Sequence, residues 1–141
     1  MSFVLDASVA LLWLVPETNP AGVDFAGVAL KALKDSQAIV PSLFALEVAN
    51  VIAKVESKGI VTEADSQRFI TLLGRLNIVT DQATAVHALG DTLNLSRRYK
   101  LSAYDAAYLE MALRTGLPLA TLDTNLAKAA KTAGVAIFGT H

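Results

Sequence analysis

Four acidic residues, all lying in otherwise apolar segments, are the side chains best suited to chemistry: Asp6, Glu47, Asp105 and Asp123. No Lys or Arg lies within four residues of any of them, so no neighbour on the same helical face neutralises their charge. Carboxylates gathered without cations repel one another, which raises their pKa values or destabilises the fold. If the chain brings the four together, a divalent cation is the usual remedy.

A site built from carboxylates alone suits Mg²⁺ or Mn²⁺, because hard cations prefer oxygen ligands. Phosphoryl transfer is the chemistry that needs such a site, since the cation activates water near neutral pH and offsets charge on the attacked phosphate. No histidine base is required, and we interpret His87 and His141 as structural or incidental. The chain has no cysteine, which excludes thiolate zinc sites, cysteine nucleophiles and disulfides.

Two of the acids also have a simple structural interpretation as helix caps. Asp6 and Asp123 each stand before a predicted helix, where a side-chain oxygen accepts a backbone N–H. Thr124 and Asn125 are competing caps for the second of these helices. Capping and metal binding therefore both remain open for this pair.

The interpretation of Asp105 depends on which way its helix faces. Glu110 and Arg114 lie about 40° apart on a helix and form a predicted solvent-facing stripe, with Asp105 about 140° from Glu110. An inward-facing carboxylate needs a partner, because desolvating it alone is costly. The alternative is that Asp105 is the third residue of a capping box begun by Ser102.

Glu47 is the acid that spacing decides least. It shares a helical stripe with Lys54 and Lys58, which is typical of a solvated face, yet Leu43 and Phe44 flank it closely. Both a surface role and a role in the site remain open for this residue.

The bulk composition predicts one domain over residues 1–141, in the cytoplasm. The hydrophobic fraction of 53% is ample for a core, and no apolar run approaches the length of a membrane span. The N-terminal apolar run contains Asp6 and lacks a basic region before it, so we expect no secretory signal. The 12 basic and 13 acidic side chains nearly cancel, so any contact with nucleic acid must be local.

Short apolar runs alternate with longer helical ones, which predicts an α/β fold whose parallel sheet is covered on both faces. The predicted strands are 3–5, 38–40, 78–80, 119–121 and 136–138, and the predicted helices are 7–15, 22–35, 43–57, 63–74, 82–97, 103–115 and 124–132. Asp6 and Asp123 each follow a strand, so the two side chains emerge on one sheet edge if both strands are parallel and central.

Two further segments have alternative interpretations. The basic run 97–100 (RRYK) fits either the end of a helix, where the macrodipole favours cations, or a contact with substrate. The apolar positions Val9, Leu12, Trp13 and Leu14 fit either core packing, which we favour, or a surface for a protein partner.

The chain resembles PIN-domain proteins, and specifically the VapC-type toxins of toxin–antitoxin pairs. Three segments carry the resemblance and span nearly the full chain in the family's order: FVLDASVALLWL, PSLFALEVANVI and LSAYDAAYLEMALRTGLPLATLDTNLAKAAKTAGV. The resemblance implies a three-layer α/β/α sandwich with a central parallel sheet of four to five strands. It also implies an Mg²⁺- or Mn²⁺-dependent endoribonuclease.

Carried over position by position, the resemblance makes the four acids the catalytic and metal-binding quartet. Ser8 and Thr121 match hydroxyl positions that flank such sites, and Asn125 matches a polar position after the last aspartate. The resemblance further implies an RNA substrate, a homodimer, no membrane association, and an antitoxin whose C-terminal segment covers the active site.

Other classes of protein remain as alternatives. A PIN nuclease of RNA processing or DNA repair, outside any toxin system, would carry the same acids, and so would a PIN-like domain that mainly binds partners. A signalling receiver domain is disfavoured, because it would pair acids after the first strand and place a lysine after the last. Here Ala7 follows Asp6, and Gly139 follows the last predicted strand.

Overall fold

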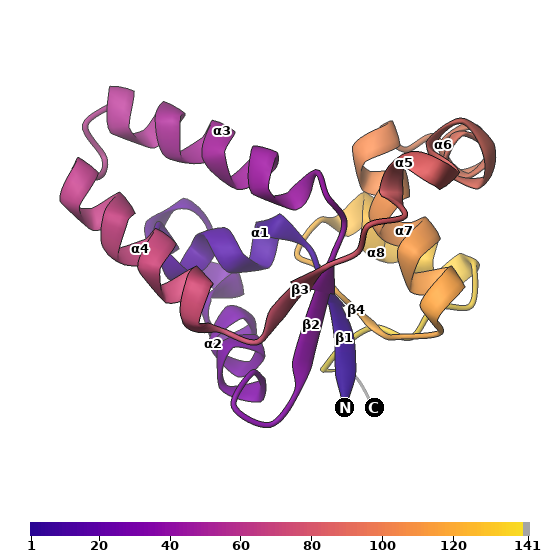
Figure 1. Ribbon diagram of the computed structural model, residues 1–141, viewed down its shortest axis with the longest axis horizontal. Helices are drawn as coiled ribbons and strands as arrows, with labels where there is room; N and C mark the ends of the chain where they lie inside the picture. Colours follow the sequence, from indigo (N-terminus) through magenta and orange to yellow (C-terminus); the bar gives the residue numbers. More distant parts are fainter. Residues whose placement is uncertain (140–141) are drawn as a thin grey trace.

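Four parallel strands form the centre of the molecule, which the computed structural model describes over residues 1–139 (Figure 1). The strands are β1 (Ser2–Leu5), β2 (Gln37–Val40), β3 (Ile78–Thr80) and β4 (Leu119–Ala120), in the spatial order β3-β2-β1-β4. β1 is central and pairs with β4 in the register Val4↔Leu119 and Leu5↔Ala120. The carboxyl ends of these two strands are therefore neighbours, as the positions of Asp6 and Asp123 in the sequence required.

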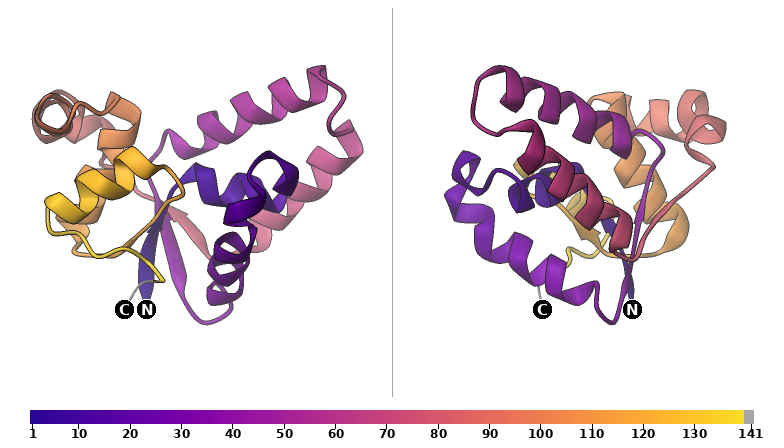
Figure 2. Two further views of the ribbon diagram at one scale, coloured as in Figure 1. Left: turned by 180° about the vertical axis from the view of Figure 1, so that it is seen from behind. Right: turned by 60° about the vertical axis from the view of Figure 1, so that its left-hand side comes forward.

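Helices cover both sides of the sheet, which confirms the predicted three-layer arrangement (Figures 1 and 2). On one side lie α1 (Ala7–Ala10), α2 (Val23–Ala32), α3 (Phe44–Ser57) and α4 (Glu63–Arg75). On the other side lie α5 (Thr84–His87), α6 (Leu93–Tyr99), α7 (Ala103–Thr115) and α8 (Thr124–Thr132). None of the helices within residues 1–139 has the length and apolar character that crossing a membrane requires.

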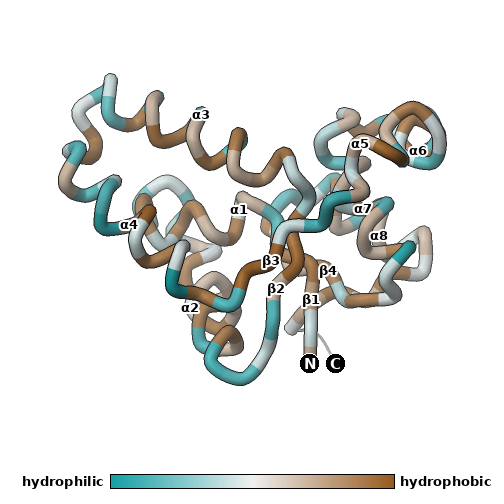
Figure 3. The backbone as a smooth tube through the Cα atoms, in the orientation of Figure 1, coloured by the Kyte–Doolittle hydropathy of each residue, from teal (hydrophilic) through white to brown (hydrophobic). Residues whose placement is uncertain are grey.

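The strands are apolar because both of their faces are buried under helices. Phe3, Val4 and Leu5 of β1 have no solvent exposure, and Leu119 of β4 is equally buried. Figure 3 shows this as brown along the strands, with teal concentrated on the outer turns. Val9 and Leu12 are buried in the same core, and Trp13 and Leu14 pack against it, so the core interpretation of this segment is correct.

Three predicted elements differ from the structure. The helix 7–15 ends at Ala10 and continues as a 3-10 turn, Leu11–Trp13. The helix 82–97 is interrupted at Gly90, whose φ of −111° and ψ of −106° are not helical, by the π-type segment Ala88–Thr92. The predicted strand 136–138 is reduced to one bridge between Leu119 and Ile137, because the chain pairs there at a single point.

Candidate functional site

Asp6 lies buried at the carboxyl end of β1, where two hydroxyl groups hold its carboxylate. Ser8 Oγ donates a hydrogen bond of 2.6 Å to Asp6 Oδ2, and Thr121 Oγ1 donates one of 2.7 Å to the same oxygen. Asp6 stands at the N-cap position of α1 but forms no side-chain cap bond there. Its environment is therefore that of a buried, oriented carboxylate rather than of a helix cap.

Asp123 does cap its helix. Its Oδ1 accepts a hydrogen bond of 2.9 Å from the Leu126 N–H at the start of α8. Its own N–H donates to Thr121 Oγ1 at 3.0 Å, so Thr121 bridges Asp123 and Asp6. The capping interpretation is correct for Asp123, while Thr124 and Asn125 do not replace it. The cap bond uses Oδ1 of Asp123 and leaves its second carboxylate oxygen for a different role.

Asp105 is half-buried in the first turn of α7. Its N–H donates to Ser102 Oγ at 3.1 Å, which is one half of a capping box. At α4, by contrast, Thr62 and Asp65 form both bonds of the box. Among the described residues only the first bond is formed at α7, so the box does not fully account for the Asp105 carboxylate.

Glu47 is half-buried in the first turn of α3 and faces α7. Its Oε1 accepts a hydrogen bond of 2.6 Å from the hydroxyl of Tyr108, a residue that is completely shielded from solvent. The solvated-face interpretation of Glu47 is therefore wrong: the carboxylate is tied to the opposite layer. We did not predict a role for Tyr108, although it lies one helical turn after Asp105 on the same face.

The four acids influence one another electrostatically. Burial raises the pKa of Asp6, and the nearby Asp123 raises it further against the lowering effect of the two hydroxyls. Burial raises the pKa of Asp105 to about 6, with Asp123 and Asp6 adding to the shift. Burial also raises the pKa of Glu47, to which Asp6 and Asp105 contribute. Each acid therefore lies within the field of at least one other.

No cation within residues 1–139 forms an ion pair with these acids. The ion pairs found within residues 1–139 involve other side chains, and none reaches the four acids. The predicted convergence of uncompensated carboxylates is thus present. Their assignment as metal ligands and catalytic residues stays a prediction.

The donor set fits a hard divalent cation by its chemistry, since it offers only carboxylate and hydroxyl oxygens. Within the described part of the chain, no three acidic or histidine side chains are already grouped as ligands of one ion.

A groove of about 520 Å³ runs beside the acids between α1 and α3. Ser8 and Asp123 lie at its edge, Leu12 and Val51 give it an apolar floor, and Lys54 lies along it. Asn125, the third predicted flanking residue, is exposed and lines a different pocket with side chains of α6. Ser8 and Thr121 thus contact Asp6 directly, whereas Asn125 does not.

Comparison with known sequences decides the family. The sequence model of the PIN domain matches residues 3–132. The chain belongs to the PIN domain family. It is 28% identical over 129 residues to Ribonuclease VapC3 of Pyrobaculum aerophilum, in an alignment that covers 91% of this chain and 94% of that protein.

Solved structures resemble this PIN domain in fold. VapBC2 from Rickettsia felis, solved with a DNA fragment of its promoter, aligns with a TM-score of 0.64 at 15% identity, covering 91% of this chain and 92% of that one. A toxin–antitoxin complex from Klebsiella pneumoniae aligns with a TM-score of 0.57 at 23% identity, covering 86% and 87%. At these identities the likeness shows the fold alone.

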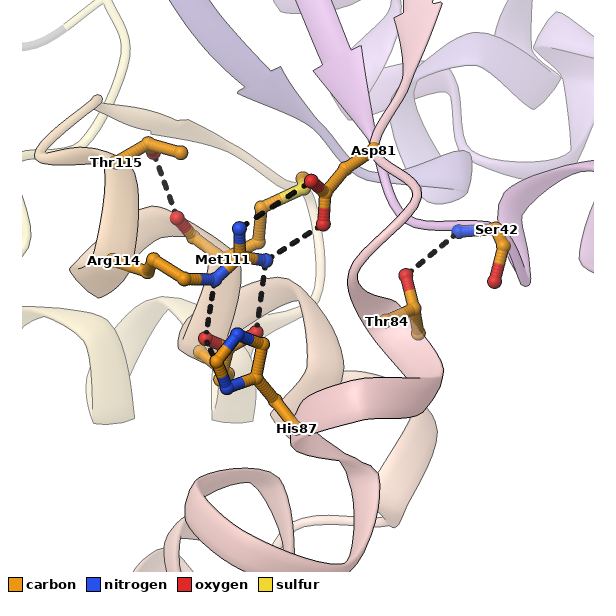
Figure 4. Close-up of polar contacts among 8 residues, drawn as sticks. Ser42, Asp81, Thr84, His87, Met111, Arg114 and Thr115 are labelled. Atoms are coloured by element: carbon orange, nitrogen blue, oxygen red, sulfur yellow. Dashed lines mark hydrogen bonds and ion pairs between the residues drawn. The ribbon is translucent and has the colours of Figure 1, made fainter.

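The predicted solvent stripe on α7 of this PIN domain is wrong for Glu110, whereas Arg114 is exposed as predicted. Glu110 is buried, and Arg114 links it to Asp81 at the end of β3 (Figure 4). Arg114 Nε lies 2.7 Å from Glu110 Oε2, and its Nη2 lies 2.6 Å from Asp81 Oδ2. His87 Nδ1 lies 4.0 Å from the same glutamate oxygen, in keeping with a structural role. The α5–α6 segment covers this face of α7, which a helical wheel cannot reveal.

Proposed function

We propose that this PIN domain is an Mg²⁺- or Mn²⁺-dependent endoribonuclease that acts as the toxin of a type II toxin–antitoxin pair. The observation that carries the proposal is the gathering of four acids around one sheet edge, with pKa values of Asp6, Glu47 and Asp105 raised and no basic partner. The similarity to a protein named as a ribonuclease supports RNA as the substrate.

The residues that would hold the cation are Asp6, Glu47, Asp105 and Asp123. When bound, the cation supplies positive charge that makes water a better nucleophile and offsets the charge on the attacked phosphodiester. Hydrogen bonds already fix one oxygen on three of the acids: Oδ2 of Asp6, Oε1 of Glu47 and Oδ1 of Asp123. These three acids and Asp105 would hold the cation through their carboxylates.

The flanking hydroxyls have a positioning role in this proposal. Ser8 and Thr121 both donate to Asp6 and both accept backbone N–H groups of the loop after β4, from Leu122 and Asp123 respectively. They therefore tie the end of β1 to the start of α8. This link fixes the relative position of two acids that lie at opposite ends of the chain.

We propose an antitoxin as the protein partner and a homodimer as the state of assembly. The fold likeness to a toxin–antitoxin complex supports the first. So does the apolar groove beside Asp123, which suits a peptide segment that covers the acids. The homodimer rests on the family resemblance, and its test is the molar mass in solution.

The deciding experiment is cleavage of a panel of RNAs by the purified protein. Cleavage should require Mg²⁺ or Mn²⁺, stop with EDTA, and be lost in Asp6→Asn and Asp105→Asn. Asp35→Asn, at an exposed position after α2, is the matched control and should retain full activity. Undiminished cleavage by the two site variants would remove the assignment.

RNA cleavage, together with growth on induced expression, separates the toxin from a partner-binding domain and from a processing nuclease. A wild-type protein that cleaves no RNA supports a domain that mainly binds partners. Cleavage without growth arrest on induced expression supports a processing nuclease outside a toxin system.

A further inference from the structure

A pocket of about 400 Å³ lies between the end of α6 and α8, and three of the seven residues that line it are cations. Arg98 and Lys100 reach it from α6 and its C-cap, Lys128 reaches it from α8, and Asn125 adds an amide. Of the described residues that line it, none is acidic.

Among residues 1–139 these cations form no ion pair. The ion pairs within residues 1–139 involve Arg68, His87 and Arg114 but none of the three pocket cations. Arg98 lies 5.6 Å from the centre of the Tyr99 ring, and all three side chains are exposed. In a chain whose net charge is −1, three unpaired cations around one hollow create a local positive potential.

The helix macrodipole accounts for only part of this arrangement. It favours cations at the end of α6, but Lys128 lies within α8, away from any such end. Lys100 is also the one non-glycine residue with a positive φ, 55°, among the described residues. That C-cap position favours glycine, so a lysine there carries a backbone cost. An anion bound in the pocket would account for a cation at both positions, Lys100 and Lys128.

The pocket lies next to two of the candidate metal-binding acids along the chain. Asn125 follows Asp123 by two residues, so their Cα atoms lie within about 7 Å of each other. Lys100 precedes Ser102, the N-cap of α7, by two residues, and Asp105 stands in the first turn of that helix. The residues that line the pocket therefore come from the chain segments that flank Asp105 and Asp123.

We propose that this pocket binds a phosphate of the RNA backbone next to the phosphate that is cleaved. This proposal rests on the proposed function, and it concerns the way in which the RNA strand is held during cleavage. Arginine and lysine are the usual phosphate ligands, and contacts to phosphates fix the register of a strand without reading its bases. The pocket supplies attraction where the four acids repel the substrate, and it directs the strand across them.

The test measures binding of a fluorescein-labelled single-stranded RNA in EDTA, so that no cleavage occurs, between about 50 and 200 mM salt. The double variant Lys100→Gln/Lys128→Gln should bind about tenfold more weakly. The slope of the logarithm of its association constant against the logarithm of salt concentration should be shallower by about 1.4, or about 0.7 for each lost phosphate contact. Lys31→Gln/Lys34→Gln, with the same change of charge on exposed residues at the end of α2, should bind as wild type.

Substitutions of Lys100 distinguish an effect on RNA binding from an effect on folding. Lys100→Gly relieves the left-handed backbone and should melt at or above the wild-type temperature while binding RNA more weakly. Lys100→Arg keeps the charge and should bind as wild type. Equal losses in the pocket and control pairs, or no loss in the pocket pair, would overturn the proposal.

Two further outcomes are also decisive. If the pocket pair loses affinity for the cognate antitoxin and not for RNA, the pocket belongs to a protein interface and the proposal fails. If the wild-type protein neither binds nor cleaves RNA, the proposed function itself fails, which differs from a failure confined to the pocket variants.

Discussion

The hydroxyl of Tyr108 donates a hydrogen bond of 2.6 Å to Oε1 of Glu47 and so joins α7 to α3 across the top of the sheet. These residues lie 61 positions apart in the chain and belong to opposite helical layers. The bond orients one acid of the candidate site from the helix that carries another.

Tyr108→Phe should destabilise the fold and weaken the site together. Losing the bond leaves a half-buried carboxylate without its donor, which should lower the free energy of unfolding by about 1–2 kcal/mol. Cleavage should fall because the orientation of Glu47 is no longer fixed. Urea unfolding and RNA cleavage measure the two effects. Tyr104→Phe removes a hydroxyl from an exposed side chain of the same helix and should change neither.

Asp105→Asn should stabilise the metal-free protein increasingly as the pH rises. The folded state raises the pKa of Asp105 from 3.8 to about 6, so it binds the proton more tightly than the unfolded chain does. This carboxyl therefore contributes stability at low pH that is lost as the pH rises through about 6. Urea unfolding in EDTA from acid to neutral pH measures the difference between variant and wild type.

Asp65→Asn should change stability in the opposite direction, although Asp65 has the same position in α4 that Asp105 has in α7. Both bonds of the α4 capping box lower the pKa of Asp65, so its contribution is present at neutral pH and is lost on acidification. This variant should therefore be less stable than wild type at neutral pH. A large loss of stability in Asp105→Asn as well would mean that Asp105 is chiefly a cap.

Mg²⁺ or Mn²⁺ should raise the melting temperature of the wild-type protein. A ligand at a hundred times its Kd adds about 2.7 kcal/mol to the free energy of unfolding by mass action. Thermal unfolding monitored with increasing metal, and again after EDTA, measures this gain. Asp6→Asn should lose most of it, whereas Asp35→Asn should keep it. A gain that persists in Asp6→Asn would place the bound ion elsewhere.

Arg114→Gln should be among the more damaging substitutions outside the site. It leaves the buried Glu110 without both of its hydrogen bonds and should cost about 3 kcal/mol. Urea unfolding of this variant and of Arg114→Gln/Glu110→Gln forms the test, because the double variant should recover part of the loss. Arg68→Gln removes an exposed ion pair and should change stability by less than about 1 kcal/mol.

Local signals explain why most elements were predictable. The helices 103–115 and 124–132 have the predicted bounds, because Ser102 and Asp123 cap their starts and Gly116 ends the first in a left-handed conformation. The strand 78–80 is also as predicted. The apolar runs predicted a parallel sheet, and β1 and β4 do pair in parallel, but the sequence did not predict that they are neighbours.

Tertiary contacts explain what was missed. Glu110 and Arg114 have the spacing of a solvent stripe. However, Arg114 donates a hydrogen bond to Asp81, which lies 33 residues earlier in the chain at the end of β3. Tyr108 acts on a residue 61 positions away, which no periodicity reveals. The four acids were named through the family resemblance, while local position alone left capping open for Asp6, Asp105 and Asp123 and a surface role open for Glu47.

The pairing of β1 with β4 also bears on synthesis of the protein. Asp6 leaves the ribosome early, yet the Thr121 hydroxyl that holds it lies 115 residues later. A nascent chain that stops before Leu119 lacks the strand that completes the sheet on that side. The hydrogen bond between Thr121 and Asp6 can therefore form only after nearly the whole chain has been synthesised.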